Sequence, residues 1–145
     1  MVIADLSSKL VFLDTTPLIY YIEGGSAFQP VLQRLFSSSD NANLFLQTST
    51  ITLLEVLVKP LKDGRRDLVE QYKEILLNAP GMTVRAVDSN VAETAAGLRA
   101  QYGLRTPDAL QLGTAIYYRS SFFLTNDKQL AKVKEIPVLL LSDLQ

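Results

Sequence analysis

Short runs of apolar and β-branched residues alternate with helical segments along almost the whole chain. The runs typical of buried strands cover 10–15, 44–49, 82–88, 122–126 and 137–142. The segments with helical periodicity cover 16–25, 28–39, 51–61, 65–81, 89–103, 105–118 and 127–135. Strands that alternate with helices form mostly parallel sheets covered on both faces. The pattern predicts an α/β fold in which ligands bind beyond the carboxyl ends of the strands.

The size of the chain and its apolar runs predict its broad class. A chain of 145 residues is typical of a single domain, here residues 1–145. No apolar run approaches the ~20 residues that span a membrane. The N-terminal stretch, interrupted by Asp5 and Lys9, lacks the layout of a signal peptide. We therefore expect a cytoplasmic protein without a membrane partner.

Two missing residue types restrict the chemistry. The chain has no cysteine and no histidine. Disulfides, thiolate nucleophiles, Ser-His-Asp catalysis and metal sites held by cysteine or histidine are therefore excluded. Any hydrolysis must rely on carboxylates, lysines, hydroxyls or a metal ion bound by oxygen. The net charge of −1 argues against a general nucleic-acid coat protein but leaves room for a local basic surface.

Asp108 stands at the head of an otherwise apolar helix, in the stretch RTPDALQLGTAIYY. A local explanation exists, because Thr106 can cap the helix and an acid in the first turn suits the helix dipole. However, Asp108 shares a helical stripe with Leu112, Ala115 and Ile116, so it is expected to point inward. A buried carboxylate needs a positive or hydrogen-bonding partner.

Three further acids lie at comparable places, each with a local alternative. Asp14 follows the first strand and could form a turn before a helix. Asp127 follows the fourth strand, where Asn126 and Gln129 could form a capping box. Glu55 lies at the margin of an apolar helix face formed by Leu53, Leu54, Leu57, Val58 and Leu61, and it could pair with Lys59 one turn later.

The four acids together predict more than any one of them does. If the first and fourth strands are neighbours, Asp14 and Asp127 leave adjacent strand ends, and two helix starts bring Glu55 and Asp108 to the same edge. Four carboxylates within a few ångströms cannot all stay ionised without a counter-charge. A hard divalent cation, Mg²⁺ or Mn²⁺, satisfies this requirement.

At these residues the chain resembles the PIN domain family, and VapC-like toxins in particular. The four stretches that carry the resemblance are VFLDTTPLIYYI, TSTITLLEVLVKP, LRTPDALQLGTA and FFLTNDKQL. The resemblance implies a three-layer α/β/α sandwich, Rossmann-like, with a mostly parallel sheet of about five strands. It also implies that Asp14, Glu55, Asp108 and Asp127 are the acidic site residues, with Thr15 and Thr125 as polar neighbours.

The resemblance further implies a Mg²⁺- or Mn²⁺-dependent endoribonuclease, the toxin of a type II toxin-antitoxin system. Its partners would be an RNA substrate, a cognate antitoxin protein and a second copy in a homodimer. Asp14 and Asp108 are the expected metal ligands, Glu55 a ligand or a group that orients water, and Asp127 a supporting residue or the ligand of a weaker second ion. About nine residues precede the first strand, more than is usual in the family.

Other classes of protein match less well. A haloacid-dehalogenase phosphatase needs a second acid where Thr16 stands, and a phospho-receiver domain needs an acidic pair before its first helix. The remaining alternative is a non-catalytic PIN-fold module that binds a protein or RNA partner. An inert module has no reason to keep four repelling acids together.

Overall fold

A parallel sheet of five strands forms the centre of the protein in a computed structural model that describes residues 1–145. The strands are β1 (Leu10–Leu13), β2 (Phe45–Ser49), β3 (Met82–Arg85), β4 (Phe122–Thr125) and β5 (Val138–Leu140). Their order across the sheet is β3-β2-β1-β4-β5, and every neighbouring pair is parallel. The α/β class and the five-stranded parallel sheet are thus confirmed.

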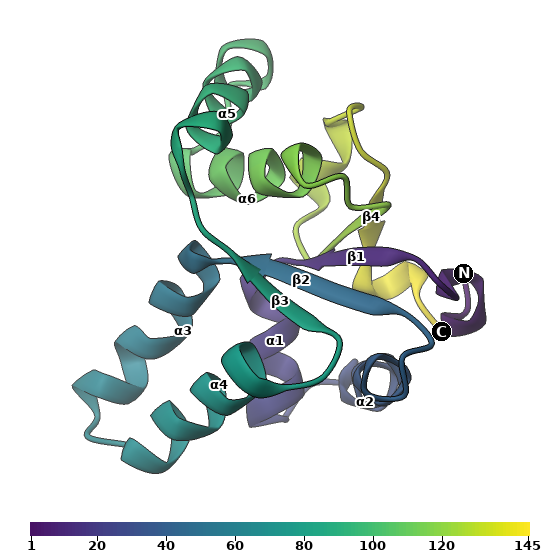
Figure 1. The fold of residues 1–145 in the computed structure, drawn as a ribbon, viewed down its shortest axis with the longest axis vertical. Helices are drawn as coiled ribbons and strands as arrows, with labels where there is room; N and C mark the ends of the chain where they lie inside the picture. Colours follow the sequence, from purple (N-terminus) through teal and green to yellow (C-terminus); the bar gives the residue numbers. More distant parts are fainter.

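Helices cover both faces of the sheet (Figure 1). The α-helices are α1 (Thr15–Glu23), α2 (Gln29–Asp40), α3 (Thr50–Lys62), α4 (Arg66–Asn78), α5 (Ser89–Tyr102) and α6 (Thr106–Tyr117). Short 3₁₀ helices are η1 (Ile3–Leu6), η2 (Lys128–Lys132) and η3 (Leu141–Asp143). In Figure 1, α1 to α4 lie below the sheet and α5 and α6 above it, which completes the three layers. No helix is long and apolar enough to cross a bilayer.

Alternating side chains of the central strands supply the two hydrophobic cores. Val11 and Leu13 point into the core beneath the sheet, whereas Phe12 points into the core above it. There Phe12 stacks on Phe123 of the neighbouring strand, with ring centroids 5.3 Å apart. Both rings are fully buried, so the pairing of β1 with β4 is fixed by apolar contact as well as by backbone hydrogen bonds.

The upper layer depends on a close approach of two helices. Gly113 of α6 faces α5, where an added Cβ would lie 3.2 Å from the backbone nitrogen of Ala95. A glycine at this position lets α6 pack tightly between α5 and the sheet. This packing explains the apolar surroundings of α6, whose buried residues include Leu112 and Ala115.

Several element ends differ from the expected ones. Thr106 does not cap α6, because the cap position is Arg105 and its side chain makes no capping bond. The sequence predicts Ser89 as the capping residue of the helix over 89–103, but Asp88 caps α5 by accepting a hydrogen bond from the backbone of Val91. Pro60 is expected to break the apolar helix over 51–61, but α3 continues through it to Lys62.

The segment after Asp127 forms only the short helix η2 in place of a helix over 127–135. Val133 and Ile136 are buried beyond its end, and Val133 already has extended backbone angles. The residue before Pro137 is also disfavoured in a helix. The chain must extend at this point to enter β5.

Residues 1–9, whose role the sequence left open, pack against the C-terminal end of the chain. Ile3 donates a backbone hydrogen bond to Gln145, and Gln145 donates one to Met1. Leu6 is fully buried in the lower core. The first segment therefore closes the end of the sheet opposite the carboxyl ends of the strands, where the two termini meet in Figure 1.

Candidate active site

The four acids line one cleft at the carboxyl ends of β1 and β4. The cleft has a volume of about 510 Å³, and its lining includes Asp14, Glu55, Asp108 and Asp127. The expected neighbourhood of the first and fourth strands is confirmed, since Leu13 lies opposite Leu124 in the register of β1 and β4. Four segments far apart in the sequence therefore supply the acids of a single surface depression.

Asp14 is held in place by two hydrogen bonds at the end of β1. Its carboxylate accepts from the backbone nitrogen of Thr15 at 2.9 Å and from the hydroxyl of Thr125 at 2.8 Å. Burial raises the pKa of Asp14, and the negative charges of Asp108 and Glu55 raise it further, against the lowering effect of the two hydrogen bonds. Asp14 therefore experiences the repulsion that the sequence predicted for crowded acids.

Glu55 reaches the cleft from the second turn of α3. Its Oε1 accepts a 2.6 Å hydrogen bond from the hydroxyl of Thr15. The alternative ion pair with Lys59 does not form, because the protein has three salt bridges and none includes Glu55.

Helix α3 buries a stripe that only partly matches the expected one. Leu53 and Leu57 of the expected face pack half-buried against the lower core, but Leu54 and Leu61 are 61% and 63% exposed. Thr52, Val56 and Pro60 face the interior instead. The buried Thr52 hydroxyl accounts for this rotation, because it joins a hydrogen-bond network beneath the cleft. The rotation places Glu55 toward Thr15 and the cleft.

Asp108 points inward as expected, and its partner is a cation that was not predicted from the sequence. The Asp108 side chain is 17% exposed, and its Oδ2 lies 3.2 Å from Nε of Arg105. Arg105 is 79% exposed at its side chain and lines the same cleft. Arg105 and Asp108 are three residues apart at the start of a helix, and this spacing places both side chains on one side of the first turn. The pair could therefore have been predicted from the sequence.

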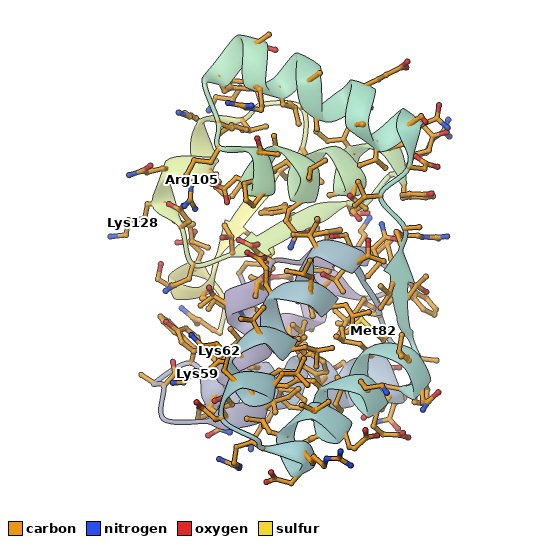
Figure 2. All side chains as sticks on the ribbon, turned by 90° about the vertical axis from the view of Figure 1, so that its left-hand side faces the viewer. Lys59, Lys62, Met82, Arg105 and Lys128 are labelled. Carbon is orange, nitrogen blue, oxygen red and sulfur yellow. The ribbon has the colours of Figure 1, made fainter.

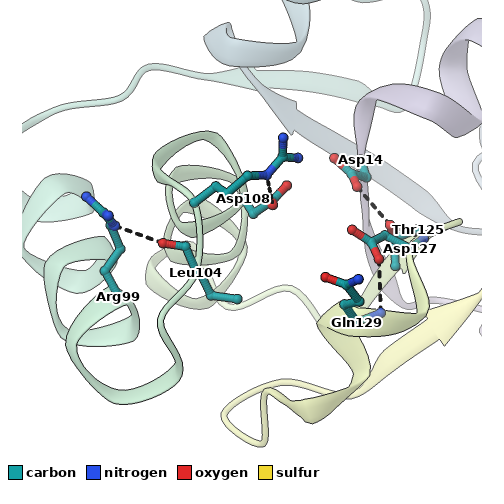
Figure 3. Close-up of polar contacts among 8 residues, drawn as sticks. Asp14, Arg99, Leu104, Asp108, Thr125, Asp127 and Gln129 are labelled. Carbon is teal, nitrogen blue, oxygen red and sulfur yellow. Dashed lines mark hydrogen bonds and ion pairs between the residues drawn. The ribbon is translucent and has the colours of Figure 1, made fainter.

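Asp127 follows β4 and is linked to Asp14 through a shared threonine. The Thr125 hydroxyl donates to Asp14 and accepts from the backbone nitrogen of Asp127 at 3.1 Å. Asp127 also accepts from the backbone of Gln129 at 2.9 Å, so it caps η2 itself and replaces the expected capping box. Figure 3 shows Asp14 and Asp127 on either side of Thr125, with Asp108 facing them from the other wall.

The donor set suits a hard divalent cation in its chemistry. All four acids offer carboxylate oxygens, the type of ligand that Mg²⁺ and Mn²⁺ prefer. One carboxylate oxygen on each of Glu55, Asp108 and Asp127 has no hydrogen-bond partner within the protein. Each of these three acids therefore has one oxygen that could bind a ligand in the cleft.

The acids are nevertheless farther apart than expected. No three of them form a group that could hold one metal ion as they stand, which corrects the expectation of four carboxylates within a few ångströms. The physical reason is that each carboxylate is held by a donor of the protein, and like charges repel across the cleft. Arg105 already occupies one carboxylate oxygen of Asp108.

Other residues of the cleft were not identified from the sequence. Lys128 and Asn126 line it from the segment after β4, and Gln111 lines its floor from α6. Arg105 and Lys128 lie near each other at the edge of the molecule, with Lys59 and Lys62 lower on the same side (Figure 2). Nothing in the local sequence marks Lys128, Asn126 or Gln111 as cleft residues, because only the fold brings them to the acids of other segments.

Comparisons with known proteins bear on the fold and on the family of the chain. A chain of a toxin-antitoxin complex from Klebsiella pneumoniae is 26% identical, with a TM-score of 0.65, over 90% of this chain and 97% of that chain. A chain of VapBC2 from Rickettsia felis, bound to a DNA fragment from the promoter, is 16% identical with a TM-score of 0.73, over 90% and 98% of the two chains.

A chain of FitAcB from Neisseria gonorrhoeae is 18% identical, with a TM-score of 0.69, over 91% of this chain and 98% of that chain. The likenesses to the Rickettsia and Neisseria chains are below 25% identity and bear on the fold alone. None of the curated proteins matches the chain in sequence. The family model of the PIN domain matches residues 11–136, which include all four acids, most of β1 and the whole of β2, β3 and β4. The chain therefore belongs to the PIN domain family.

Proposed function

We propose that the protein is a Mg²⁺- or Mn²⁺-dependent endoribonuclease that hydrolyses RNA phosphodiester bonds. The observation that carries this proposal is the convergence of Asp14, Glu55, Asp108 and Asp127 on one cleft, where burial and, to a smaller extent, the charges of Asp108 and Glu55 raise the pKa of Asp14. A cleft of mutually repelling carboxylates is suited to bind a cation. Membership of the PIN domain family supports the assignment to a nuclease.

Each acid has a separate proposed role. Asp14 and Asp108 hold the metal ion from opposite walls of the cleft, and Glu55 either joins them or orients the attacking water. Asp127 supports Asp14 through Thr125, or holds a weaker second ion. When bound there, a divalent ion would lower the pKa of a water molecule and stabilise negative charge on the phosphate.

The cations at the rim supply the affinity for RNA. Arg105 and Lys128 line the cleft beside the acids, and their side chains are exposed. The guanidinium of Arg105 can bind a phosphate group through two parallel hydrogen bonds. A phosphate at the cleft would offer Arg105 an alternative to Asp108, and a metal ion would then have free access to that carboxylate.

The biological role that fits best is that of a toxin in a type II toxin-antitoxin system. Four of the similar structures are described as toxin-antitoxin complexes or as VapBC proteins, and the Klebsiella complex is 26% identical. We accordingly propose a cognate antitoxin protein as partner, a homodimer as the toxin assembly, and the cytoplasm as the location. The single domain covers residues 1–145.

Cleavage of RNA by the purified protein tests the activity. Synthetic RNA is incubated with the wild type in Mn²⁺ or in EDTA, and with Asp14→Asn in Mn²⁺. We expect fragments only for the wild type in Mn²⁺. Asp143→Asn is the matched control, because Asp143 is exposed and its side chain makes no hydrogen bond. If EDTA or Asp14→Asn leaves cleavage unchanged, the activity belongs to a contaminant or to another site.

The alternative of a non-catalytic module that binds a protein or RNA partner is distinguished by the same variants. A binding module would retain RNA or protein binding in EDTA and would show no cleavage in Mn²⁺. For the toxin role, expression of the wild type should arrest bacterial growth, and Asp14→Asn should relieve the arrest. Growth that is equally slow with Asp14→Asn would exclude nuclease activity as the cause.

A further inference from the structure

A buried network of polar side chains lies directly beneath the acidic cleft. It joins Thr15 of α1, Thr48 and Ser49 of β2, Thr52 of α3 and Gln111 of α6. Four of the five are between 0% and 1% exposed. A polar network sealed from water in this way is highly directional, because every donor and acceptor must find its partner inside the protein.

Gln111 is the central member of the network. Its Oε1 accepts a 2.5 Å hydrogen bond from Ser49, its Nε2 donates to Thr52 at 2.6 Å, and the same nitrogen lies 3.4 Å from the hydroxyl of Thr15. One side chain of α6 thereby contacts the strand β2 and the first turns of α1 and α3. Asp108 lies three residues earlier on α6, so Gln111 connects the helix of one acid to the helix of another.

The hydrogen positions follow from the number of donors. Each hydroxyl has a single proton, and the amide nitrogen of Gln111 can only donate. The Thr15 oxygen therefore accepts from within the network, which leaves its own proton for Glu55 at 2.6 Å. The network thus directs one strong donor at the Glu55 carboxylate from below.

We infer that Gln111 is a positioning residue that fixes Glu55 against Asp108 across the cleft, acting through Thr15 and Thr52. The inference rests on the proposed metal-dependent nuclease function and deepens it. Without the amide, α3 and α1 lose their shared link to α6, and the Thr15 hydroxyl is free to turn from Glu55 to Thr52. The carboxylates would then be held less firmly in the arrangement that binds the metal ion.

A purely structural role for Gln111 makes a different prediction. Loss of a buried network would lower stability without any specific effect on the acids. The two roles are separated by comparing Gln111→Met with Thr114→Val. Thr114 is also fully buried on α6, but its hydroxyl bonds only to the backbone oxygen of Leu110 within the same helix. Both substitutions remove a buried polar group at nearly constant volume.

The experiment measures Mn²⁺ affinity by calorimetry on the whole chain, the melting temperature in EDTA, and the kcat and KM of RNA cleavage. For Gln111→Met we expect Mn²⁺ affinity to fall about 10-fold, and kcat to fall by a similar factor with KM little changed. For Thr114→Val we expect a lower melting temperature with Mn²⁺ affinity and kcat as in the wild type. Gln111→Met with Mn²⁺ affinity like the wild type overturns the inference.

A second pair of variants covers the case in which Gln111→Met does not fold. Thr15→Val removes the hydroxyl that contacts Glu55, and Thr15→Ser keeps it. We expect the valine variant to lose Mn²⁺ affinity and the serine variant to retain it, whereas equal affinities would contradict the inference. Failure of the wild type to bind Mn²⁺ would overturn the proposed function itself, and the inference with it. Normal binding and cleavage by the wild type, with no effect of these variants, would overturn the inference alone.

Discussion

Replacement of Asp14 by asparagine separates a metal-binding role of the cleft from a structural one, because the two roles predict opposite changes in stability. Burial and the charges of Asp108 and Glu55 raise the pKa of Asp14, so its ionised form costs folding free energy at neutral pH. Asparagine removes the charge and keeps an oxygen that can accept from Thr15. We therefore expect Asp14→Asn to raise the melting temperature in EDTA.

Bound Mn²⁺ should also raise the melting temperature of the wild type, and the size of the rise can be calculated. Mn²⁺ at about 100 times its Kd stabilises the folded state by about 2.7 kcal/mol. For a chain of 145 residues, the entropy of unfolding is about 0.3 kcal/mol per kelvin, so this corresponds to a rise of about 9 °C. Asp14→Asn should show no such rise, because it lacks a proposed ligand.

Thermal melts followed by circular dichroism test both statements. The wild type, Asp14→Asn and the control Asp143→Asn are each melted in EDTA and in millimolar Mn²⁺. We expect the control to match the wild type in both conditions. Identical melting of the wild type with and without Mn²⁺ would refute a metal site in this cleft. Strong destabilisation by Asp14→Asn in EDTA would mean that the carboxylate serves the fold.

Three further predictions concern pH, the competing cation and a strained turn. In EDTA, the Asp14 carboxyl loses its proton at a lower pH in the unfolded protein than in the folded one, because its pKa is raised on folding. The stability of the wild type should therefore fall as the pH rises from about 4 through the folded pKa of Asp14. A fall of equal size in Asp14→Asn would contradict this. Arg105→Gln should leave the melting temperature within about 3 °C, because the Arg105 side chain is 79% exposed and a pair with one end in water contributes at most about 1 kcal/mol. Calorimetry should show tighter Mn²⁺ binding, and kinetics a higher KM for RNA. Gly81→Ala should cost about 2 kcal/mol or more in urea unfolding, because its Cβ would lie 2.5 Å from the Ser39 hydroxyl at a φ of +75°. The matched Gly64→Ala, with a φ of +67° and open space around it, should lose only about 1 kcal/mol.

The order of the elements could be predicted because strand and helix periodicities are local properties of the sequence. The strand before Asp14 and the strand before Asp127 were recognised from their apolar runs, and the structure places them side by side. The inward direction of Asp108 followed from its position on a helical stripe. These inferences needed only the geometry of single elements and a general rule for parallel sheets.

The capping residues and the ends of the elements were predicted less well. Ser89 and Asp88 are both good capping residues, and the backbone geometry of the preceding loop decides which of them caps. The helix expected after Asp127 is shortened by the burial of Val133 and Ile136. Competition among neighbouring residues of similar propensity is settled by packing.

The face of α3 shows why apolar content alone was misleading. Leucines at 54 and 61 mark an apolar stripe, yet the interior receives Thr52 and Val56 instead. The hydroxyl of Thr52 has partners on β2 and α6, which no local pattern reveals. A buried polar residue is stable only where such partners exist.

The sequence by itself determined the parallel α/β architecture, the four acids and the absence of histidine and cysteine chemistry, because residue types and periodicities are fixed along the chain. Only the tertiary structure decided that Arg105 holds Asp108 and that Gln111 lies beneath Glu55. It also decided that the carboxylates stand on opposite walls of the cleft. Distances between residues remote in sequence depend on how helices rotate and pack, and packing is a property of the whole fold.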